Sequence, residues 1–288
     1  MPIKTILAGL RGEAPDATIL ATAGGLAKRF DAHVSALHVE PDPGDLIASM
    51  PIDVGGGAFF MEELTKSIQA SSATHRDAAK RAFSDWRKAA GIAEAASPGD
   101  ATGPSADLAL EIGLEQSILR DRALLADLVI LGLAASDDID ASLALEAALL
   151  DAGRPLLALP HKVSAPAADG PVAIAWNASA ESARALAAAL PIITGAKDAV
   201  ILHAGAALDD GALARARDYL GWHGVKARIE ELGNGDSVDI LLADRAAALG
   251  AAMLVMGAYT HSRARELVFG GVTRHMLKES AVPLLLSH

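Results

Sequence analysis

Short apolar runs recur along the chain, and alanine-rich stretches of helical length lie between them. In the first half these runs are "KTILAGL" (4–10), "HVSALHVE" (33–40), "ADLVILGLA" (126–134) and "GRPLLALP" (153–160). Apolar runs of about four to eight residues are typical of strands buried on both faces of a parallel sheet. The intervening stretches, such as residues 14–30, predict helices. The pattern therefore indicates alternating strands and helices.

The second half repeats this order. Its runs are "PVAIAWN" (171–177), "DAVILHAG" (198–205), "AAMLVMGAY" (251–259) and "AVPLLLSH" (281–288). Gly132 then matches Gly257, and Pro155 matches Pro283. A repeat at this scale indicates two copies of one folding unit. Because right-handed crossovers place helices on both faces of a parallel sheet, we expect two tandem doubly wound five-stranded α/β sheets, Rossmann-like in architecture.

The small, proline-containing segment 164–171 is the predicted linker. It divides the chain into a first domain over 1–163 and a second over 170–288. The last strands, "PLLAL" and "PLLLS", are apolar and would be exposed at a sheet edge, which favours pairing between the halves. We expect a pseudo-dimer within one chain. Whether the whole chain also forms a homodimer stays open.

The halves differ by an insert over residues 41–64, between the second strand and the second helix of the first domain. It is rich in glycine and proline and carries several apolar residues. Two interpretations stay open. The insert is a loop whose apolar residues pack on its own domain, or it is a lid or contact surface.

Composition narrows the classes of function. The 288 residues carry a formal net charge of −11, which argues against a nucleic-acid partner. The chain has no cysteine, so disulfides and thiolate metal sites are excluded. No apolar stretch approaches the roughly 18 residues of a membrane helix, and the apolar run at the N-terminus is too short for a signal peptide. We expect a soluble, cytoplasmic protein without a membrane partner.

The stretch "MGAYTHSRARELVFGGVTRHML" (256–277) carries the clearest candidate chemistry. Gly257 follows a predicted strand, and Gly270 and Gly271 open a predicted helix. Glycines allow close approach to a backbone, and a helix N-terminus offers free N–H groups to an anion. Alternatively, the glycines serve a strand exit and close helix–sheet packing. Thr273 either reaches a phosphate or satisfies a local backbone group.

The loop in this stretch is basic, whereas the chain as a whole is acidic. Its charged side chains either form a positive collar for a triphosphate or are a solvated surface. From position 261 to 278 there are four Lys or Arg residues and one acidic residue, Glu266. The candidate residues of the collar are His261, Arg263, Arg265 and Arg274.

These features resemble the universal stress proteins in a tandem arrangement, over nearly the whole chain. Nucleotide-binding members of that family carry Gly-x2-Gly-x9-Gly-(Ser/Thr) after the fourth strand. Here Gly257 and Gly270 match, Thr260 replaces the second glycine, and Gly271 replaces the Ser/Thr. The family aspartate after the first strand corresponds to Asn177 in the second domain.

The resemblance implies a site for ATP, ADP or AMP, with or without Mg²⁺, in the second domain. Thr260 adds a Cβ where glycine allows close approach, although its hydroxyl can donate to a phosphate oxygen. The residues implied to line the site are Ala175, Trp176, Asn177, Ala204, Met256, Gly257, Ala258, Thr260, Arg263, Gly270, Gly271, Val272 and Thr273. For Trp176 the competing interpretation is packing at the core or its rim.

The first domain is expected to have lost this site. Ser142 and Leu143 stand where the second domain has Gly270 and Gly271, and Leu145 stands where it has Thr273. The preceding loop carries Asp137, Asp138 and Asp140, which would repel phosphate. Arg11 takes the position of the family aspartate.

The expected function is that of a stress-response protein whose C-terminal domain binds an adenine nucleotide, acting as a sensor or adaptor toward an unknown protein partner. One alternative is an interaction protein of the same fold without nucleotide. Another is a slow nucleotide hydrolase, with at most weak ATPase activity. No catalytic residue is predicted, because no nucleophile elbow or phosphate-loop lysine motif is present, and the histidines lack zinc-site spacing.

Overall fold

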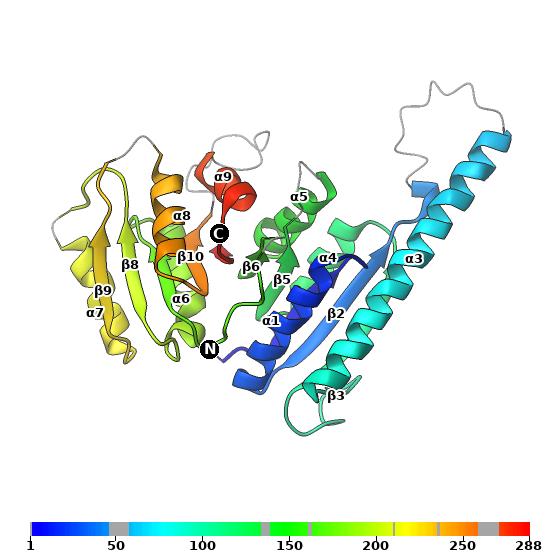
Figure 1. Ribbon diagram of the computed structural model, residues 1–288, viewed down its shortest axis with the longest axis horizontal. Helices are drawn as coiled ribbons and strands as arrows, with labels where there is room; N and C mark the ends of the chain where they lie inside the picture. The colour runs from blue at the N-terminus through cyan, green and yellow to red at the C-terminus, as the bar shows by residue number, and fades with distance from the viewer. Residues whose placement is uncertain are drawn as a thin grey trace.

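The computed structural model describes residues 2–45, 58–133, 139–160, 163–209, 211–234, 237–258 and 271–288. For residues 58–61, 139–142, 271 and 274 the backbone alone is described. Within these ranges, strands and helices alternate as the apolar pattern predicts (Figure 1).

The first half contains the strands β1 to β6. Its elements are β1 (Thr5–Leu10), α1 (Pro15–Phe30), β2 (His33–Glu40), α3 (Ala58–Ala90), β3 (Ala93–Glu94), β4 (Ser105–Ile112), α4 (Glu115–Ala123), β5 (Leu128–Gly132), α5 (Ile139–Glu146), a π-helical turn (Ala147–Asp151) and β6 (Leu156–Leu159).

The second half contains the strands β7 to β11. Its elements are β7 (Val172–Ala175), α6 (Ala180–Ile193), β8 (Ala199–His203), α7 (Ala212–Trp222), β9 (Ala227–Glu231), α8 (Val238–Ala248), β10 (Met253–Gly257), α9 (Gly271–Glu279) and β11 (Leu284–Ser287).

The strand order confirms the doubly wound fold and the repeat. The order is β3-β4-β2-β1-β5-β6-β11-β10-β7-β8-β9, and every pair within either half is parallel. Apart from the two-residue β3, each half has the third, second, first, fourth and fifth strands side by side. Gly132 ends β5 opposite Leu159, and Gly257 ends β10 opposite Ser287. The matched glycines thus hold equivalent places.

The two halves meet along their last strands, as the apolar edges predict. β6 and β11 pair antiparallel, with Leu157 opposite Leu285. Both leucines are at most 1 % exposed. The structure adds that this pairing joins the two predicted sheets into one sheet of eleven strands.

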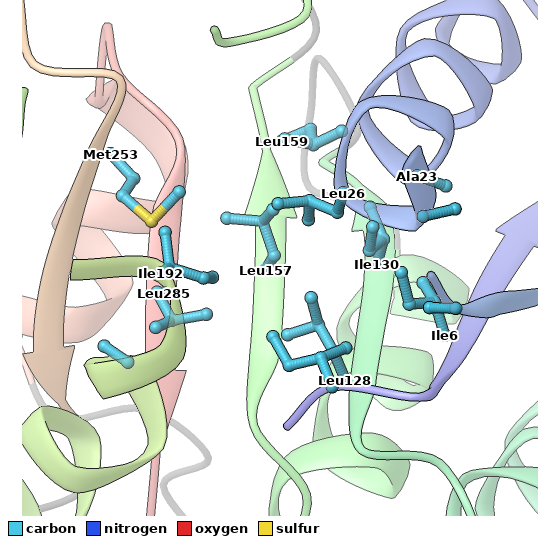
Figure 2. Close-up of a cluster of buried hydrophobic side chains, with 14 of the residues drawn as sticks. Ile6, Ala23, Leu26, Leu128, Ile130, Leu157, Leu159, Ile192, Met253 and Leu285 are labelled. Atoms are coloured by element: carbon cyan, nitrogen blue, oxygen red, sulfur yellow. The ribbon is translucent and has the colours of Figure 1, made fainter. Parts of the chain in front are cut away.

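The hydrophobic core is divided by the faces of this sheet rather than by its halves. One buried cluster contains side chains of α1, α3, α6 and α7, and the other contains side chains of α4, α5, α8 and α9. Figure 2 shows the first cluster at the junction, where Leu26 and Leu157 of the first half face Ile192 and Leu285 of the second.

The helix α3 is the largest departure from the repeat. It has 33 residues, whereas its counterpart α7 has 11. Figure 1 shows it extending well past the end of β2. The predicted insert over 41–64 was therefore too long at its C-terminal end, because α3 begins at Ala58. Residues 46–57 of the insert lie outside the described ranges.

Arg29, in the last turn of α1, connects the first half to the linker and to the second half. Its Nη1 donates to the carbonyl of Ala168, and its Nη2 donates to the carbonyls of Pro191 (3.2 Å) and Ile192 (2.7 Å) at the end of α6. A Cβ at Gly195 would overlap the guanidinium. Burial lowers the pKa of Arg29. One cation thus satisfies carbonyls at the C-terminus of a helix in the other half.

We predict that Arg29→Ala lowers the free energy of unfolding by about 2 kcal/mol or more, because hydrogen bonds to charged groups contribute about 1.5–3 kcal/mol each. Urea unfolding followed by circular dichroism measures the change. Arg120→Ala is the matched control, because the Arg120 side chain contacts its exposed neighbour Asp121 at the surface. An equal loss in the two variants would contradict a bridging role for Arg29.

Candidate site at the carboxyl ends of the strands

The exit of β7 forms a tight turn into α6. Asn177 accepts a hydrogen bond at Oδ1 from the amide of Ser179 (3.2 Å), and Ala178 has a left-handed φ of 59°. Ser179 caps the helix by accepting from the amide of Ser182 (3.1 Å). Open α/β sheets bind ligands outside the carboxyl ends of their strands, where the strand order reverses. This turn lies there, because β7 has β8 on one side and β10 on the other.

Gly257, the first glycine of the predicted motif, has a packing role in the described structure. A Cβ at this position would lie 2.6 Å from the amide nitrogen of Ser182 and 2.6 Å from the carbonyl carbon of Glu181. The glycine therefore lets the N-terminus of α6 approach the exit of β10. Packing therefore accounts for Gly257. The same close contact brings the N-terminus of α6 to the carboxyl ends of the strands.

The other predicted residues of the β7, β8 and β10 exits lie around the same edge. Trp176 packs on the cluster beneath α6 and α7, and its buried Nε1 has no acceptor among the described residues. Ala175 and Ala204 are half-buried, and Met256 and Ala258 are buried against the opposite face. Packing thus explains the ring of Trp176, although its N–H remains unsatisfied.

The predicted phosphate-binding residues are described in part. α9 begins at Gly271, Val272 is 39 % exposed, and Thr273 is buried. Thr260, Arg263 and Gly270 lie outside the described residues, as do His261 and Arg265. The structure therefore brings the exits of β7, β8 and β10 together, while the contact of the glycine pair with phosphate stays a prediction.

In the first domain a buried carboxylate fills the equivalent turn. The registers of β1 with β5 and of β7 with β10 make Arg11, Gly12 and Asp16 equivalent to Asn177, Ala178 and Ser182. Asp16 accepts from the amides of Arg11 (3.0 Å) and Gly12 (2.8 Å). Gly12 has a φ of 75°, and with this left-handed turn the two amides reach the two oxygens of one carboxylate.

The second domain leaves the same two amides open. Ser182 turns its hydroxyl to the carbonyl of Ser179 (2.9 Å) and does not reach them. Within the described part of the chain, no hydrogen bond satisfies the amides of Asn177 and Ala178. The fold thus offers one pair of backbone donors twice, occupied in the first domain and open in the second. Sequence reasoning missed Asp16, an acidic residue in the first turn of α1, and that position was its available signal.

Burial raises the pKa of Asp16, although the two amide hydrogen bonds and the charge of His38 oppose this change. The folded state therefore holds a proton that the unfolded state has lost above about pH 4. The carboxylate destabilises the fold progressively as the pH rises from the unfolded pKa through the folded pKa.

We predict that the stability of the wild type, relative to Asp16→Asn, falls as the pH rises through the range just above pH 4. Asp107→Asn is the opposed control. Burial of Asp107 favours a higher pKa, but hydrogen bonds with His33 and Ser35 and the charges of His33 and Arg122 outweigh it and lower the pKa. The stability of the wild type relative to Asp107→Asn should rise with pH in the range below about pH 4. Urea unfolding across this range tests both signs, and the same sign in both would contradict the assignment.

Two hollows flank an ion pair at the first domain's edge. Arg11 Nη2 lies 3.0 Å from Glu115 Oε2, and both side chains are partly exposed. The smaller hollow, about 40 Å³, lies between the exits of β1 and β5. The larger, about 350 Å³, lies between the exit of β2, α3 and the start of α4. Arg11, Glu13 and Glu115 line both.

Neither a metal centre nor a membrane span is found in the described ranges. There, no three His, Asp or Glu side chains come together as ligands of an ion. Among the described helices, none combines the length and the apolarity that crossing a membrane requires.

Solved structures with this architecture include universal stress proteins. One from Archaeoglobus fulgidus DSM 4304 matches with a TM-score of 0.68 and 16 % identity, over 98 % of this chain and 95 % of that one. A putative universal stress protein from Pseudomonas aeruginosa UCBPP-PA14 matches with a TM-score of 0.56 and 17 % identity, over 99 % and 93 %. A functionally unknown protein from Pseudomonas aeruginosa PAO1 matches with a TM-score of 0.54 and 16 % identity, over 99 % and 92 %.

The chain therefore has the universal stress protein fold along nearly its whole length, as the motif resemblance predicts. No protein-family model matches the sequence, and a search of curated proteins gives no match.

Proposed function

We propose that the chain acts as a tandem universal stress protein, with domains over 1–163 and 170–288, whose second domain binds ATP or a related adenine nucleotide. The observation that carries this proposal is the open pair of amides at Asn177 and Ala178. Asp16 shows which group such a pair of donors binds, because its carboxylate accepts from the equivalent amides in the first domain. An anion or a hydroxyl of a nucleotide is the corresponding external ligand in the second domain.

The phosphates belong, in this proposal, at the start of α9. The amides of Gly270, Gly271 and Val272 would face them, and Thr260 and Thr273 would lie close by. A helix N-terminus stabilises a nearby anion by about 0.3–2 kcal/mol. The exposure of Val272 supports access to this end of α9. The basic residues near Arg263 would add an attraction that salt weakens.

The proposed role is that of a sensor or adaptor, in which bound nucleotide reports to a protein partner. The absence of cysteine fits a reducing compartment, and we place the protein in the cytoplasm. Mg²⁺ would accompany a triphosphate. We propose no more than slow turnover, because the sequence carries neither a nucleophile elbow nor a phosphate-loop lysine motif.

A nucleotide-free adaptor is the second candidate. The observation in its favour is that Gly257 is explained by contact with Glu181 and Ser182, without any ligand. Asn177 likewise uses its side chain on the amide of Ser179. Nucleotide binding and its absence are distinguished directly by mass spectrometry of the native protein as purified.

We predict that Ser182→Asp weakens ATP binding about tenfold or more, because the new carboxylate would occupy the amides of Asn177 and Ala178 as Asp16 occupies their equivalents. Calorimetry with ATP and Mg²⁺ measures the affinity. Ala187→Asp is the control, since it adds the same charge at an exposed position of α6. Unchanged affinity in Ser182→Asp would remove the open amides from the site.

Two substitutions address the phosphate end. Gly270→Asp should abolish binding, because it places a side chain and a negative charge where the phosphates would lie. Thr260→Gly should strengthen binding if the Cβ obstructs the phosphates and weaken it if the hydroxyl donates to them. If the wild type binds no adenine nucleotide at millimolar concentration with Mg²⁺, the nucleotide proposal fails and the adaptor takes its place.

A further inference from the structure

We propose that the outer edge of β4, over residues 107–112, is the interface between two copies of this chain, paired antiparallel about a two-fold axis at Leu110. The inference concerns assembly and is independent of nucleotide binding. β4 lies next to the end of the sheet, where the two-residue β3 is its outer neighbour. β3 pairs with Ser105 and Ala106, so among the described strands the rest of β4 has β2 on one side and no strand on the other.

The backbone of β4 directs unpaired groups to this edge. Successive residues of a strand point their amide and carbonyl groups to alternate sides. The amide of Ser105 donates to the carbonyl of Ala32 on the β2 side (3.3 Å), and the carbonyl of Ala106 accepts from the amide of Ala95 on the β3 side (3.1 Å). The residues that face outward beyond β3 therefore share the direction of Ala106, and they are Leu108, Leu110 and Ile112.

The side chains at this edge are apolar and accessible. Leu110 is 38 % exposed and Ile112 is 67 % exposed. Because side chains alternate along a strand, both lie on the face of Leu108, which packs against the cluster beneath α3. An edge strand that combines unpaired backbone groups with exposed aliphatic side chains is a template for pairing with another chain.

The opposite edge of the same sheet provides a comparison. It is formed by β9, whose side chains carry ion pairs. Arg228 lies 3.1 Å from Asp198, and Arg245 donates to Glu230 (3.0 Å). Charged side chains of this kind discourage pairing between edges. The exposed side chains on the α3 face of β4 are aliphatic, so the two ends of the sheet differ in the protection that they carry.

The sequence of β4 is complementary to itself. An antiparallel pairing centred on Leu110 places this residue opposite its own copy, Leu108 opposite Ile112, and Ala109 opposite Glu111. Apolar side chains then meet apolar side chains, and no like charges stand directly opposite each other. All outward-facing residues fall in hydrogen-bonded pairs, which gives about six backbone hydrogen bonds, two for each pair. Such an interface closes on two copies and does not extend into a filament.

The helix α3 fits the same two-fold axis. Its residues Ala79 and Phe83 share a buried cluster with Val34 of β2 and Ala106 of β4, and Figure 1 shows the helix running alongside β2. Since neighbouring strands lie about 4.8 Å apart, the axis would place the two α3 helices about 10 Å apart, which is close to the usual distance between packed helices. The chain already joins its two halves by antiparallel pairing of apolar strands, at β6 and β11.

The first test is the oligomeric state of the full chain, measured by sedimentation velocity from about 1 to about 100 µM. We expect a reversible dimer. Leu110→Lys should weaken dimerisation about tenfold or more, because it brings two like charges directly opposite each other. Leu125→Lys is the matched control, at a leucine that is 86 % exposed and lies outside this edge, and it should leave dimerisation unchanged.

The second test examines the register and does not depend on the folding of Leu110→Lys. The chain has no cysteine, so each variant below introduces a single thiol. With diamide as the oxidant, Leu110→Cys should form a disulfide-linked dimer, because facing Cα atoms in such a pair lie about 5.5 Å apart, within the range of a disulfide. Ile112→Cys is more exposed, yet it should cross-link far more slowly because it faces Leu108.

Three results would overturn the proposal. They are a monomeric wild type at about 100 µM, equal dimerisation of the wild type and a folded Leu110→Lys variant, and equal cross-linking of the two cysteine variants. A monomer that binds a synthetic peptide of residues 105–112 at this edge would also overturn it, since the occupant would then be a strand of another protein. Failure of ATP binding would leave the proposal standing.

Discussion

The antiparallel pairing of β6 with β11 is the interaction on which the rest of the molecule depends. Two apolar edge strands, which would otherwise expose unpaired backbone groups, satisfy each other and bury Leu157 and Leu285. Because the sheet continues through this pair, each face carries a hydrophobic cluster that crosses from one half to the other. Arg29 reinforces the junction on the face of α1 and α6, where it ties both the linker and the α6 terminus.

This pairing also fixes where the two candidate sites lie. The other strands of the first half run parallel to β6, and the other four strands of the second half run parallel to β11. Since β6 and β11 run in opposite directions, the carboxyl ends of the strands in the two halves point in opposite directions. The Asp16 turn and the Ser182 turn therefore share no cleft. Each half is free to hold a ligand of its own, and coupling between them would have to pass through the junction.

The sequence predicted the parts of this fold that are buried on both sides. β1, β5 and their counterparts β7 and β10 read as nearly unbroken apolar runs because helices cover both faces. β4 and β9 gave no comparable run, since they lie near the sheet edges and charged residues such as Asp107 and Arg228 interrupt them. The start of α3 was missed because it follows a glycine-rich stretch. The role of Asp16 depends on two amides converging through the left-handed Gly12, which is geometry that no spacing reveals.

The two copies of the folding unit share a backbone but differ in the side chains at the exit of their first strand. The two domains share two features around the exits of β1 and β7. Gly12 and Ala178 both have a left-handed φ. His38 and His203 each place Nδ1 3.0 Å from a carbonyl oxygen at the exit of the neighbouring strand. What differs is which donor or acceptor the chain satisfies by itself. The first domain fills its two amides with Asp16, whereas the second leaves the equivalent amides open. An open pair of backbone donors suits an anion or a hydroxyl, so the difference between Asp16 and Ser182 decides which of the two turns is free for an external ligand.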